Sequence, residues 1–415
     1  MPKPEPQEFH RRVLDRIEDP YPVYRAYREA GTLHRVPWPG TGRSPEWLVL
    51  GYDEAAAVLA GRAFGRRAAP GRGKGQRGPA VVPPGYPELA ALVGNWLAFM
   101  DPPRHTRVRA VVAECIARRL RSGIRARLKE HVGTVVERLA KEPGFELVEE
   151  YAAVVPMLTM LDLLGVPHQD HEWLRGQVSC VQQAVAYRSG GDEPRLLTAE
   201  RAAGALSEYF RTALARRRRD PRRDLLSLLL AAPWEEDLAG EDLLVATCVH
   251  LLAAGHETTT AALSKSALLL LRTPSLLAGL RDAPGRLSAA VDEFLRLDPP
   301  MQTVSRWAVQ DEEIAGHRIG RGDLVTVVLG AANRDPAQFE EPDSVRFDRD
   351  SRKHCAFGMG GHYCLGSALA RTEMEAGVSG LLDLLPGRRP AAGNVPYRRG
   401  LALHGPLRLP VERDE

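Results

Sequence analysis

A segment near the C-terminus carries a cysteine among residues that suit metal binding. It reads Phe-Gly-Met-Gly-Gly-His-Tyr-Cys-Leu-Gly from Phe357 to Gly366, and a helical pattern follows it. The start of a helix favours the thiolate form of a cysteine, and the thiolate is the form that ligates metals. The glycines allow backbone conformations that other residues resist, so the loop can lie close to a flat ligand. The segment therefore predicts that Cys364 ligates a metal.

Zinc is one alternative for this metal. Four zinc-type ligands occur within eleven residues: His354, Cys355, His362 and Cys364. Structural zinc motifs usually pair their ligands two to four residues apart. Here two ligands are adjacent, and phenylalanine and glycine occupy the gap before His362. This spacing favours another metal centre over zinc.

The most apolar stretch of the chain contains a second group of polar residues. It runs from Leu243 to Leu271 and carries Ala-Gly-His-Glu-Thr-Thr at 254–259. Its charged and histidine residues argue against a membrane span, so a long buried helix is predicted. Burying a carboxylate and a hydroxyl without partners costs free energy, which suggests that Glu257 and Thr258 are functional. A polar patch on a surface helix is the alternative.

Two charged pairs lie on predicted helices. Glu293 and Arg296 are three residues apart within a predicted helix over 285–297, so both side chains share one face. Such pairs are common on solvated helices, and only the order of the motifs along the chain makes this one informative. His105 and Arg109 share a face of a predicted helix over 104–120, for which a solvated basic face is the alternative.

Together these motifs resemble those of the cytochrome P450 family. The haem-binding loop of that family has the pattern F-x-x-G-x-H/R-x-C-x-G, and every fixed position matches: Phe357, Gly360, His362, Cys364 and Gly366. The A-G-x-D/E-T-T and E-x-x-R motifs precede it in family order. The resemblance spans about residue 15 to the C-terminus. It implies a haem b cofactor (iron protoporphyrin IX) with the Cys364 thiolate as axial ligand.

The resemblance also implies roles for individual residues. Glu257 and Thr258 are expected to deliver protons to bound dioxygen. Arg346 is expected to join Glu293 and Arg296 in a buried network that fixes the scaffold beneath the haem. The remaining residues are expected to bind the cofactor: Gly255, Phe357 and Gly358, with His105, Arg109, Arg306 and His362 at the two propionates.

The activity implied by the resemblance is that of a haem-thiolate monooxygenase. It would use dioxygen and two electrons from a ferredoxin and its reductase to hydroxylate or epoxidise a small organic substrate. The high Arg, Ala, Gly and Pro content resembles that of high-GC bacteria, in which many relatives tailor secondary metabolites. Two alternatives stay open. The same chemistry could serve oxidative coupling or ring formation in natural-product biosynthesis, or the chain could be a non-enzymatic haem or zinc sensor.

Basic residues indicate where acidic partners would bind. Arg104, Arg107, Arg352 and Lys353 are candidates for a ferredoxin docking patch, with a solvated surface as the alternative. The segment 61–78 holds six Lys and Arg residues and no acid. It is predicted to be a loop that either forms a solvated lid or recognises an anionic substrate or an acidic carrier protein.

The elements that position these residues are mostly helices. Helical patterns cover about 104–120, 122–141, 151–164, 170–187, 198–218, 240–271, 285–297 and 365–384, with short strands near 47–50, 303–309, 312–319, 324–328 and 398–408. This predicts a mainly α protein with small β-sheets. By resemblance, residues 1–415 form one cytochrome P450 domain with a flexible segment over 1–14. The haem would lie between the long central helix and the helix after the cysteine loop.

The composition excludes several classes of protein. An apolar fraction of 44% and a charged fraction of 26% are typical of soluble globular chains. Lys and Arg number 56 against 53 Asp and Glu, so there is no global charge to attract nucleic acid or an anionic membrane. Five scattered cysteines form no disulfide framework, and the polar N-terminus is no signal peptide. A cytoplasmic enzyme is expected.

Overall fold

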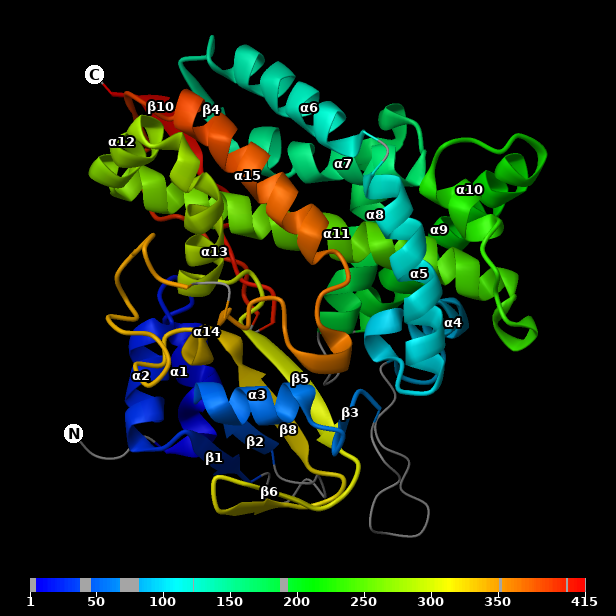
Figure 1. Cartoon of the computed structure of the whole chain (residues 1–415), viewed down its shortest axis with the longest axis horizontal. Helices are drawn as coiled ribbons and strands as arrows, with labels where there is room; N and C mark the ends of the chain where they lie inside the picture. The colour runs from blue at the N-terminus through cyan, green and yellow to red at the C-terminus, as the bar shows by residue number, and fades with distance from the viewer. Residues whose placement is uncertain are drawn as a thin grey trace. The chain divides into compact units, whose positions relative to one another are not determined.

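The computed structural model describes residues 5–37, 46–67, 82–121, 123–186, 193–350, 353–400 and 402–414. Helices dominate and the strands are short, which confirms the predicted mainly α fold class (Figure 1). The chain forms two compact units. The first contains residues 1–78, 134–152 and 258–415, and the second contains residues 79–133 and 153–257.

A five-stranded mixed sheet organises the first unit. Its strands lie in the order β1 (Leu33–Val36), β2 (Glu46–Val49), β8 (Leu324–Val328), β5 (Thr303–Ala308) and β3 (Phe64–Gly65). The pairing of β2 with β8 is parallel, and the other pairs are antiparallel. β-Branched residues such as Val325 and Val327 are buried in one cluster with Val58 of α3 (Tyr52–Ala60). The strands predicted near 47–50, 303–309 and 324–328 are confirmed.

Two smaller sheets also belong to the first unit. One contains β4 (Gly144–Glu146), β10 (Pro410–Arg413) and β9 (Arg388–Pro390), and the other is a hairpin of β6 (Glu312–Ile314) and β7 (His317–Ile319). Ala315 and Gly316 turn this hairpin with φ of 50° and 75°, so the pattern at 312–319 is two strands and a tight turn. The strand predicted over 398–408 is wrong. The described part of that segment makes only isolated bridges, such as Tyr397 with Pro406.

The N-terminal helices pack into the core of the first unit. They are α1 (Phe9–Asp15) and α2 (Tyr21–Ala30). The ring of Phe9 stacks on Tyr24 at 5.9 Å and meets Tyr27 edge-on at 5.1 Å, and Phe9 is fully buried. Within the segment 1–14, residues 6–14 are helical and include the buried Phe9, while the flexibility predicted for this segment stays a prediction. Residues 1–4 lie outside the described residues.

Four further helices belong to the first unit. They are α12 (Pro274–Asp282), α13 (Leu287–Leu297), α14 (Leu329–Ala332) and α15 (Ser367–Leu384). The long α11 (Glu241–Arg272) begins in the second unit and ends in the first. Its second half packs so closely on α15 that a Cβ on Gly377 would lie 2.5 Å from the Leu263 side chain. A glycine is therefore needed where these two helices meet.

The second unit is built from helices. These are α4 (Pro87–Gly94), α5 (Arg104–Leu120), α7 (Val154–Leu164), α8 (His171–Ala186), α9 (Glu193–Arg219) and α10 (Leu225–Leu230), while α6 (Ile124–Leu139) continues into the first unit. Helices α8 and α9 pack against each other. The Asp224 carboxylate caps α10 by accepting a hydrogen bond from the Ser227 N–H at 2.9 Å. The predicted boundaries of α5 are confirmed.

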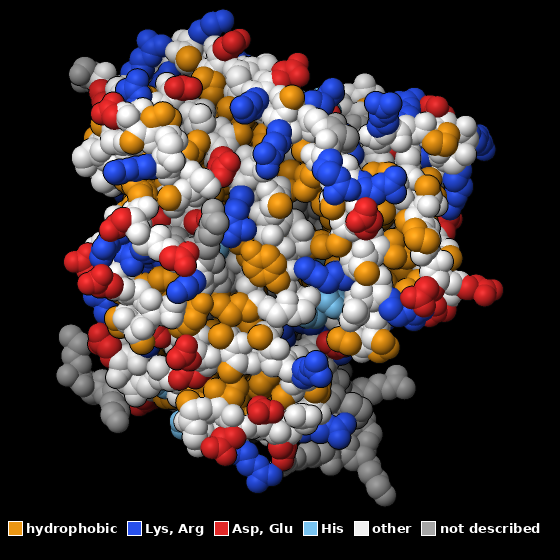
Figure 2. Space-filling model, in the orientation of Figure 1, with side chains coloured by type: hydrophobic (Ala, Val, Ile, Leu, Met, Phe, Trp, Pro, Cys, Tyr) orange, Lys and Arg blue, Asp and Glu red, His pale blue; other side chains and the backbone are white. Residues whose placement is uncertain are grey.

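Two surface properties agree with the composition. Across the described ranges, no helix has both the length and the apolar character needed to cross a membrane. Positive and negative side chains are interspersed over the face that Figure 2 shows, as the near-equal numbers of basic and acidic residues predict.

Candidate active site

The cysteine loop is a compact turn that presents Cys364 at the start of a helix. The Cys364 N–H donates a hydrogen bond to the Phe357 carbonyl at 2.8 Å, across the 3-10 turn η8 (Gly360–His362). The N–H of Ser367, the first residue of α15, donates to the Cys364 carbonyl at 3.3 Å. The Cys364 side chain is partly exposed. A helix N-terminus beside an accessible thiol favours the thiolate, which is the form that ligates iron.

Two glycines of the loop are required for different reasons. Gly358 and Gly360 have φ of 69° and 66°, values that residues with a Cβ rarely adopt. At Gly360 space is also limited, because a Cβ would lie 2.6 Å from the backbone of Ala60 in α3. At Gly358 a Cβ would meet only the His362 carbonyl at 3.8 Å. The conformation of the loop and its seat on α3 therefore both depend on glycine.

A network that sequence reasoning missed holds Phe357. The Arg371 guanidinium lies over the Phe357 ring, 4.6 Å from its centroid, and its Nε donates to Asp292 at 2.8 Å. His354 lies 3.5 Å from the same carboxylate. Burial alone would raise the pKa of Asp292, but the nearby His354 imidazole and the hydrogen bond from Arg371 lower it below its usual value. The loop is thus anchored to α13 through a charged carboxylate.

The alternative zinc site is not formed. The Cys355 thiol is fully buried and donates to the Asn333 amide oxygen at 3.0 Å, while its backbone N–H donates to the same oxygen at 2.7 Å. Burial raises the pKa of the Cys355 thiol to about 12. Within the described ranges, the four zinc-type side chains between His354 and Cys364 do not gather into one ligand cluster. Cys355 is a structural residue of this loop.

Glu293 and Arg296 form a buried network, while its predicted role beneath the haem stays a prediction. Arg296 donates to both carboxylate oxygens of Glu293 at 2.8 Å, and both side chains are fully buried. The guanidinium also donates to the carbonyls of Asn333, Pro342 and Ser344. A single residue of α13 thereby fixes the chain that leads toward the cysteine loop.

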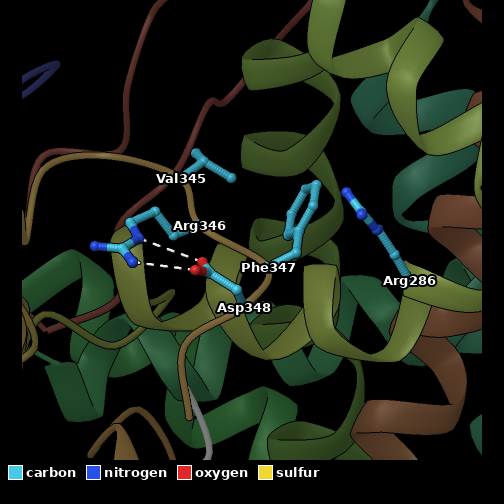
Figure 3. Close-up of a pocket in the computed structure, with 5 residues that line it drawn as sticks. All are labelled: Arg286, Val345, Arg346, Phe347 and Asp348. Carbon is cyan, nitrogen blue, oxygen red and sulfur yellow. Dashed lines mark hydrogen bonds and ion pairs between the residues drawn. The ribbon is translucent and has the colours of Figure 1, made fainter.

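The third member of this network is Arg349, and the prediction of Arg346 is wrong. The Arg349 Nε donates to Glu293 at 3.0 Å from an almost buried position. Arg346 donates only its backbone N–H to Glu293. Its guanidinium turns to Asp348 and Glu340 at a surface hollow lined by Arg286, Val345, Arg346, Phe347 and Asp348 (Figure 3). The two arginines are three residues apart, and spacing alone did not reveal which side chain points inward.

The segment that contains Glu257 and Thr258 lies in the middle of α11, where a few residues on one side of the helix are accessible. Glu257 is buried, while Ala254, Gly255 and Thr258 are at least partly accessible. A Cβ on Gly255 would lie 2.4 Å from the sulfur of Met160, so close packing against α7 requires glycine there. Gly255 therefore has a packing role in addition to the predicted cofactor contact.

A buried carboxyl next to this segment was also missed. Glu373 of α15 accepts a hydrogen bond from the Thr259 hydroxyl at 3.0 Å. Its other carboxyl oxygen has no hydrogen-bond partner among the described residues, and burial raises the pKa of Glu373 to about 8. The raised pKa favours the protonated form of Glu373 near neutral pH, and the Thr259 hydroxyl links α11 to α15 through this carboxyl. In sequence Glu373 looks like any acid on an amphipathic helix, so no local signal marks it.

The four predicted propionate ligands divide between the two units. His105 is buried and Arg109 is partly exposed, both on α5 of the second unit. Arg306 is buried in β5 and His362 lies in η8, both in the first unit. Their convergence on one cofactor stays a prediction. The donor set fits haem: an accessible thiol, a loop whose glycines leave room, and buried cationic or imidazole groups on defined elements.

The basic residues predicted to bind partners differ in the contacts that they make. Arg104 and Arg107 are engaged by Asn95, Glu235 and Asp237. The Arg66 side chain donates to the Ser305 carbonyl of β5 at 2.5 Å, and this contact attaches the start of the loop to the sheet. Arg352 and residues 68–78 of the basic loop 61–78 lie outside the described residues. Because Arg107 is already paired with two carboxylates, these contacts argue against its predicted role in ferredoxin docking. Recognition of an anionic substrate or an acidic carrier protein by the loop 61–78 stays a prediction.

Comparison with known proteins identifies relatives across the whole chain. A model of the family described as Cytochrome P450 matches residues 286–384. The nocardicin C N-oxygenase of Nocardia uniformis subsp. tsuyamanensis is 35% identical over 371 residues, which cover 88% of this chain and 89% of that protein. The mycinamicin IV hydroxylase/epoxidase of Micromonospora griseorubida is 34% identical over 377 residues, with coverages of 88% and 89%.

A solved structure shares the same architecture. P450BioI, in complex with hexadec-9Z-enoic acid ligated acyl carrier protein, matches with a TM-score of 0.86 and 28% identity, over 96% of this chain and 100% of that chain. The predicted single-domain fold is thereby confirmed, while its extent over 1–415 stays a prediction. From the loop, the helices and these relatives, it follows that the chain belongs to the cytochrome P450 family, the haem-thiolate monooxygenases.

Proposed function

We propose that this P450 inserts one oxygen atom of dioxygen into a small organic secondary metabolite, by hydroxylation or epoxidation. The observation that carries the proposal is an accessible Cys364 at a helix N-terminus in a chain that also keeps the Glu257–Thr258 pair on α11. Relatives named as an N-oxygenase and a hydroxylase/epoxidase support it. Haem b, held by Cys364, supplies the oxygen-activating chemistry when bound.

Two residues of α11, Thr258 and Glu257, would bind and transfer the protons that the reaction needs. The Thr258 hydroxyl both donates and accepts hydrogen bonds, so its Oγ1 can hold a water molecule or pass on a proton. The Glu257 carboxylate can take up a proton and return it within the same helix turn. Thr259 is not available for this task, because its hydroxyl is bound to Glu373. Of the two threonines in the motif, Thr258 is therefore the one assigned to catalysis.

The axial ligand is tested by the spectrum of the reduced, carbon-monoxide-bound holoenzyme. Thiolate ligation gives a red-shifted Soret band that nitrogen ligation does not give. Cys364→His should abolish this band. Cys180→Ala, which removes another partly exposed cysteine, should keep it and serves as the matched control. Retention of the red-shifted band in Cys364→His would exclude the assignment.

The acid–alcohol pair is tested by the fate of reducing equivalents. Thr258→Ala should leave consumption of NAD(P)H and dioxygen intact but divert them to hydrogen peroxide. Thr260→Ala makes the same change two residues along α11 and should preserve the yield. An unchanged amount of product per NAD(P)H in Thr258→Ala would contradict the proposed role.

The class of reaction is read from the product. Oxygen insertion adds one oxygen atom to the substrate, whereas oxidative coupling or ring formation removes two hydrogen atoms. Mass spectrometry of turnovers under ¹⁸O₂ separates the two. Compounds to test are chosen by a low-to-high-spin spectral shift on binding. A product without the label would favour coupling or ring formation.

The electron donors are proposed to be a small acidic ferredoxin and its reductase. Docking through opposite charges predicts that turnover falls as salt rises, because exposed charges are screened over about 10 Å at 0.1 M ionic strength. Lys353, an exposed residue of the first unit, is the described candidate for this contact. Turnover that is independent of salt would rule out docking by charge.

An acidic carrier protein is a second candidate partner. The observation that favours it is the likeness to P450BioI, whose solved complex contains a fatty-acyl carrier protein. We propose that a substrate tethered to such a carrier binds better than the free acid. Spectral titration of the holoenzyme with acyl-carrier protein, the free acid and the carrier without its acyl group tests this. Tighter binding of the free acid would contradict it.

A further inference from the structure

Three metal-type ligands meet at one point of the second unit, on elements that the cysteine loop does not use. They are His131 of α6, Asp162 of α7 and His168 of the short turn η4 (His168–Asp170). The Nε2 of His131 lies 2.7 Å from Asp162 Oδ2, and the Nε2 of His168 lies 2.9 Å from Asp162 Oδ1. The three ligand atoms all lie within 4.8 Å of one another.

The spacing of these atoms is near that of a divalent cation site. Zinc binds imidazole nitrogen at about 2.0–2.1 Å and carboxylate oxygen at about 2.0–2.2 Å, so the ligand atoms of a tetrahedral site lie roughly 3.3 Å apart. Both imidazoles already direct Nε2 toward the same carboxylate. A modest rotation of the carboxylate and the outer imidazole would therefore admit an ion between them. Two imidazoles and one carboxylate suit zinc better than magnesium or calcium.

The three ligands differ in freedom in a way that suits ion exchange. His131 and Asp162 are largely buried, and the Asp162 carbonyl accepts a hydrogen bond from Arg119 at 2.8 Å, which fixes that turn of α7. The His168 side chain is 40% exposed, so an ion can enter from that side. The carbonyl of His168 is hydrogen-bonded to His171 Nδ1 at 3.1 Å, which holds η4 in place. Water would complete the coordination on the exposed side.

One cation already competes for the carboxylate. The Arg127 Nε donates to Asp162 Oδ2 at 3.0 Å, but its side chain is 55% exposed and can move into solvent at little cost. A bound ion would replace this guanidinium as the partner of Asp162. Arg127 is therefore expected to lower the affinity of the site for a divalent cation without preventing the cation from binding.

We propose that His131, Asp162 and His168 form a binding site for a divalent cation of the zinc class. The ion would link α6, α7 and η4, and the site takes no part in the oxygen chemistry proposed above. Its expected effect is to stabilise the second unit, because a ligand that binds only the folded state raises the free energy of unfolding.

The test is equilibrium dialysis of the holoenzyme against Zn²⁺, followed by metal analysis of the protein. The wild type should bind one more Zn²⁺ per chain than His168→Ala, or bind it roughly tenfold more tightly or better. His317→Ala removes an exposed histidine of β7 in the first unit, which does not belong to the cluster, and should match the wild type. Arg127→Ala should bind Zn²⁺ more tightly.

A second measurement guards against variants that misfold. The thermal unfolding midpoint of each variant is recorded without and with Zn²⁺. Zn²⁺ should raise the midpoint of the wild type and of His317→Ala, and it should not raise that of Asp162→Asn or His168→Ala. Equal Zn²⁺ stoichiometry, affinity and stabilisation in the wild type, Asp162→Asn and His168→Ala would overturn the proposal.

Discussion

Two arginines of this protein donate hydrogen bonds from every nitrogen of their guanidinium groups, but one is buried and the other is partly exposed to solvent. Arg296 of α13 is fully buried and donates to Glu293 and to three backbone carbonyls. Arg107 of α5 is 30% exposed and donates to Glu235 and Asp237, which are mostly in solvent. By the number of hydrogen bonds alone, the two sites are similar.

The difference between them is what can replace a lost partner. Around Arg107 water can solvate any group that loses its contact, so the pair adds little to stability. Arg296 is fully buried, so removing one partner leaves a charge buried without compensation. Burial and compensation together, and not the count of ion pairs, should decide the effect of each substitution.

The largest effect is expected at the centre of the buried network. Glu293→Gln keeps the shape of the side chain but leaves Arg296 and Arg349 without their shared carboxylate. The free energy of unfolding should fall by about 3–5 kcal/mol, measured by urea denaturation of the holoenzyme. Glu340→Gln makes the same change at an exposed partner of Arg346 and is the control. Equal losses in the two variants would show that burial does not decide.

A smaller loss is expected where the buried charge keeps other partners. Lys265 of α11 donates to Asp298 at 2.7 Å and to the Pro299 carbonyl at 2.9 Å, and Asp298 also accepts from Tyr21. Lys265→Met should lower the free energy of unfolding by about 2–3 kcal/mol. The double variant with Asp298→Asn should lose less than the sum of the single variants, because the two changes remove one interaction. Strict additivity would argue against the pair.

Glu373 extends the comparison, because it is a buried carboxyl that forms no ion pair with a described Lys, Arg or His residue. Its pKa is raised to about 8 in the folded protein, against a usual value of 4.5. The stability that it contributes is fully present below pH 4.5 and is lost as pH rises to about 8, since only the unfolded state ionises freely in that window.

The test is urea denaturation of the wild type and Glu373→Gln at several pH values. The difference between their unfolding free energies should shift by roughly 1 kcal/mol per pH unit between pH 5 and 7, in favour of the variant as pH rises. Glu375→Gln, two residues along α15, is the control. A difference that stays constant with pH would mean that Glu373 does not titrate in this range.

The smallest effect is expected at the exposed network. Arg107→Ala should leave the unfolding midpoint unchanged within error, because Glu235 and Asp237 are already solvated. Differential scanning fluorimetry at low and high salt measures this. A loss comparable to that of Glu293→Gln would break the comparison.

Much of the fold was predictable because its signals are local. Periodic apolar residues predicted α5 over 104–120, and the turn residues before α15 predicted where the cysteine loop ends. The burial of Phe9 was not predictable, because charged and proline residues surround it in sequence and its partners Tyr24 and Tyr27 come later in the chain.

The sequence by itself determined the chemistry of the site: Cys364 in a glycine-rich turn, and an acid beside an alcohol in an apolar helix. These are properties of neighbouring residues, so spacing reveals them. Only the tertiary structure decided that the side chain of Arg349 and not that of Arg346 reaches Glu293. It also decided that Arg371, bound to Asp292, lies over the Phe357 ring and that Glu373 accepts a hydrogen bond from Thr259. Each of these contacts joins residues distant in the chain, and which side chain is desolvated depends on how the helices pack.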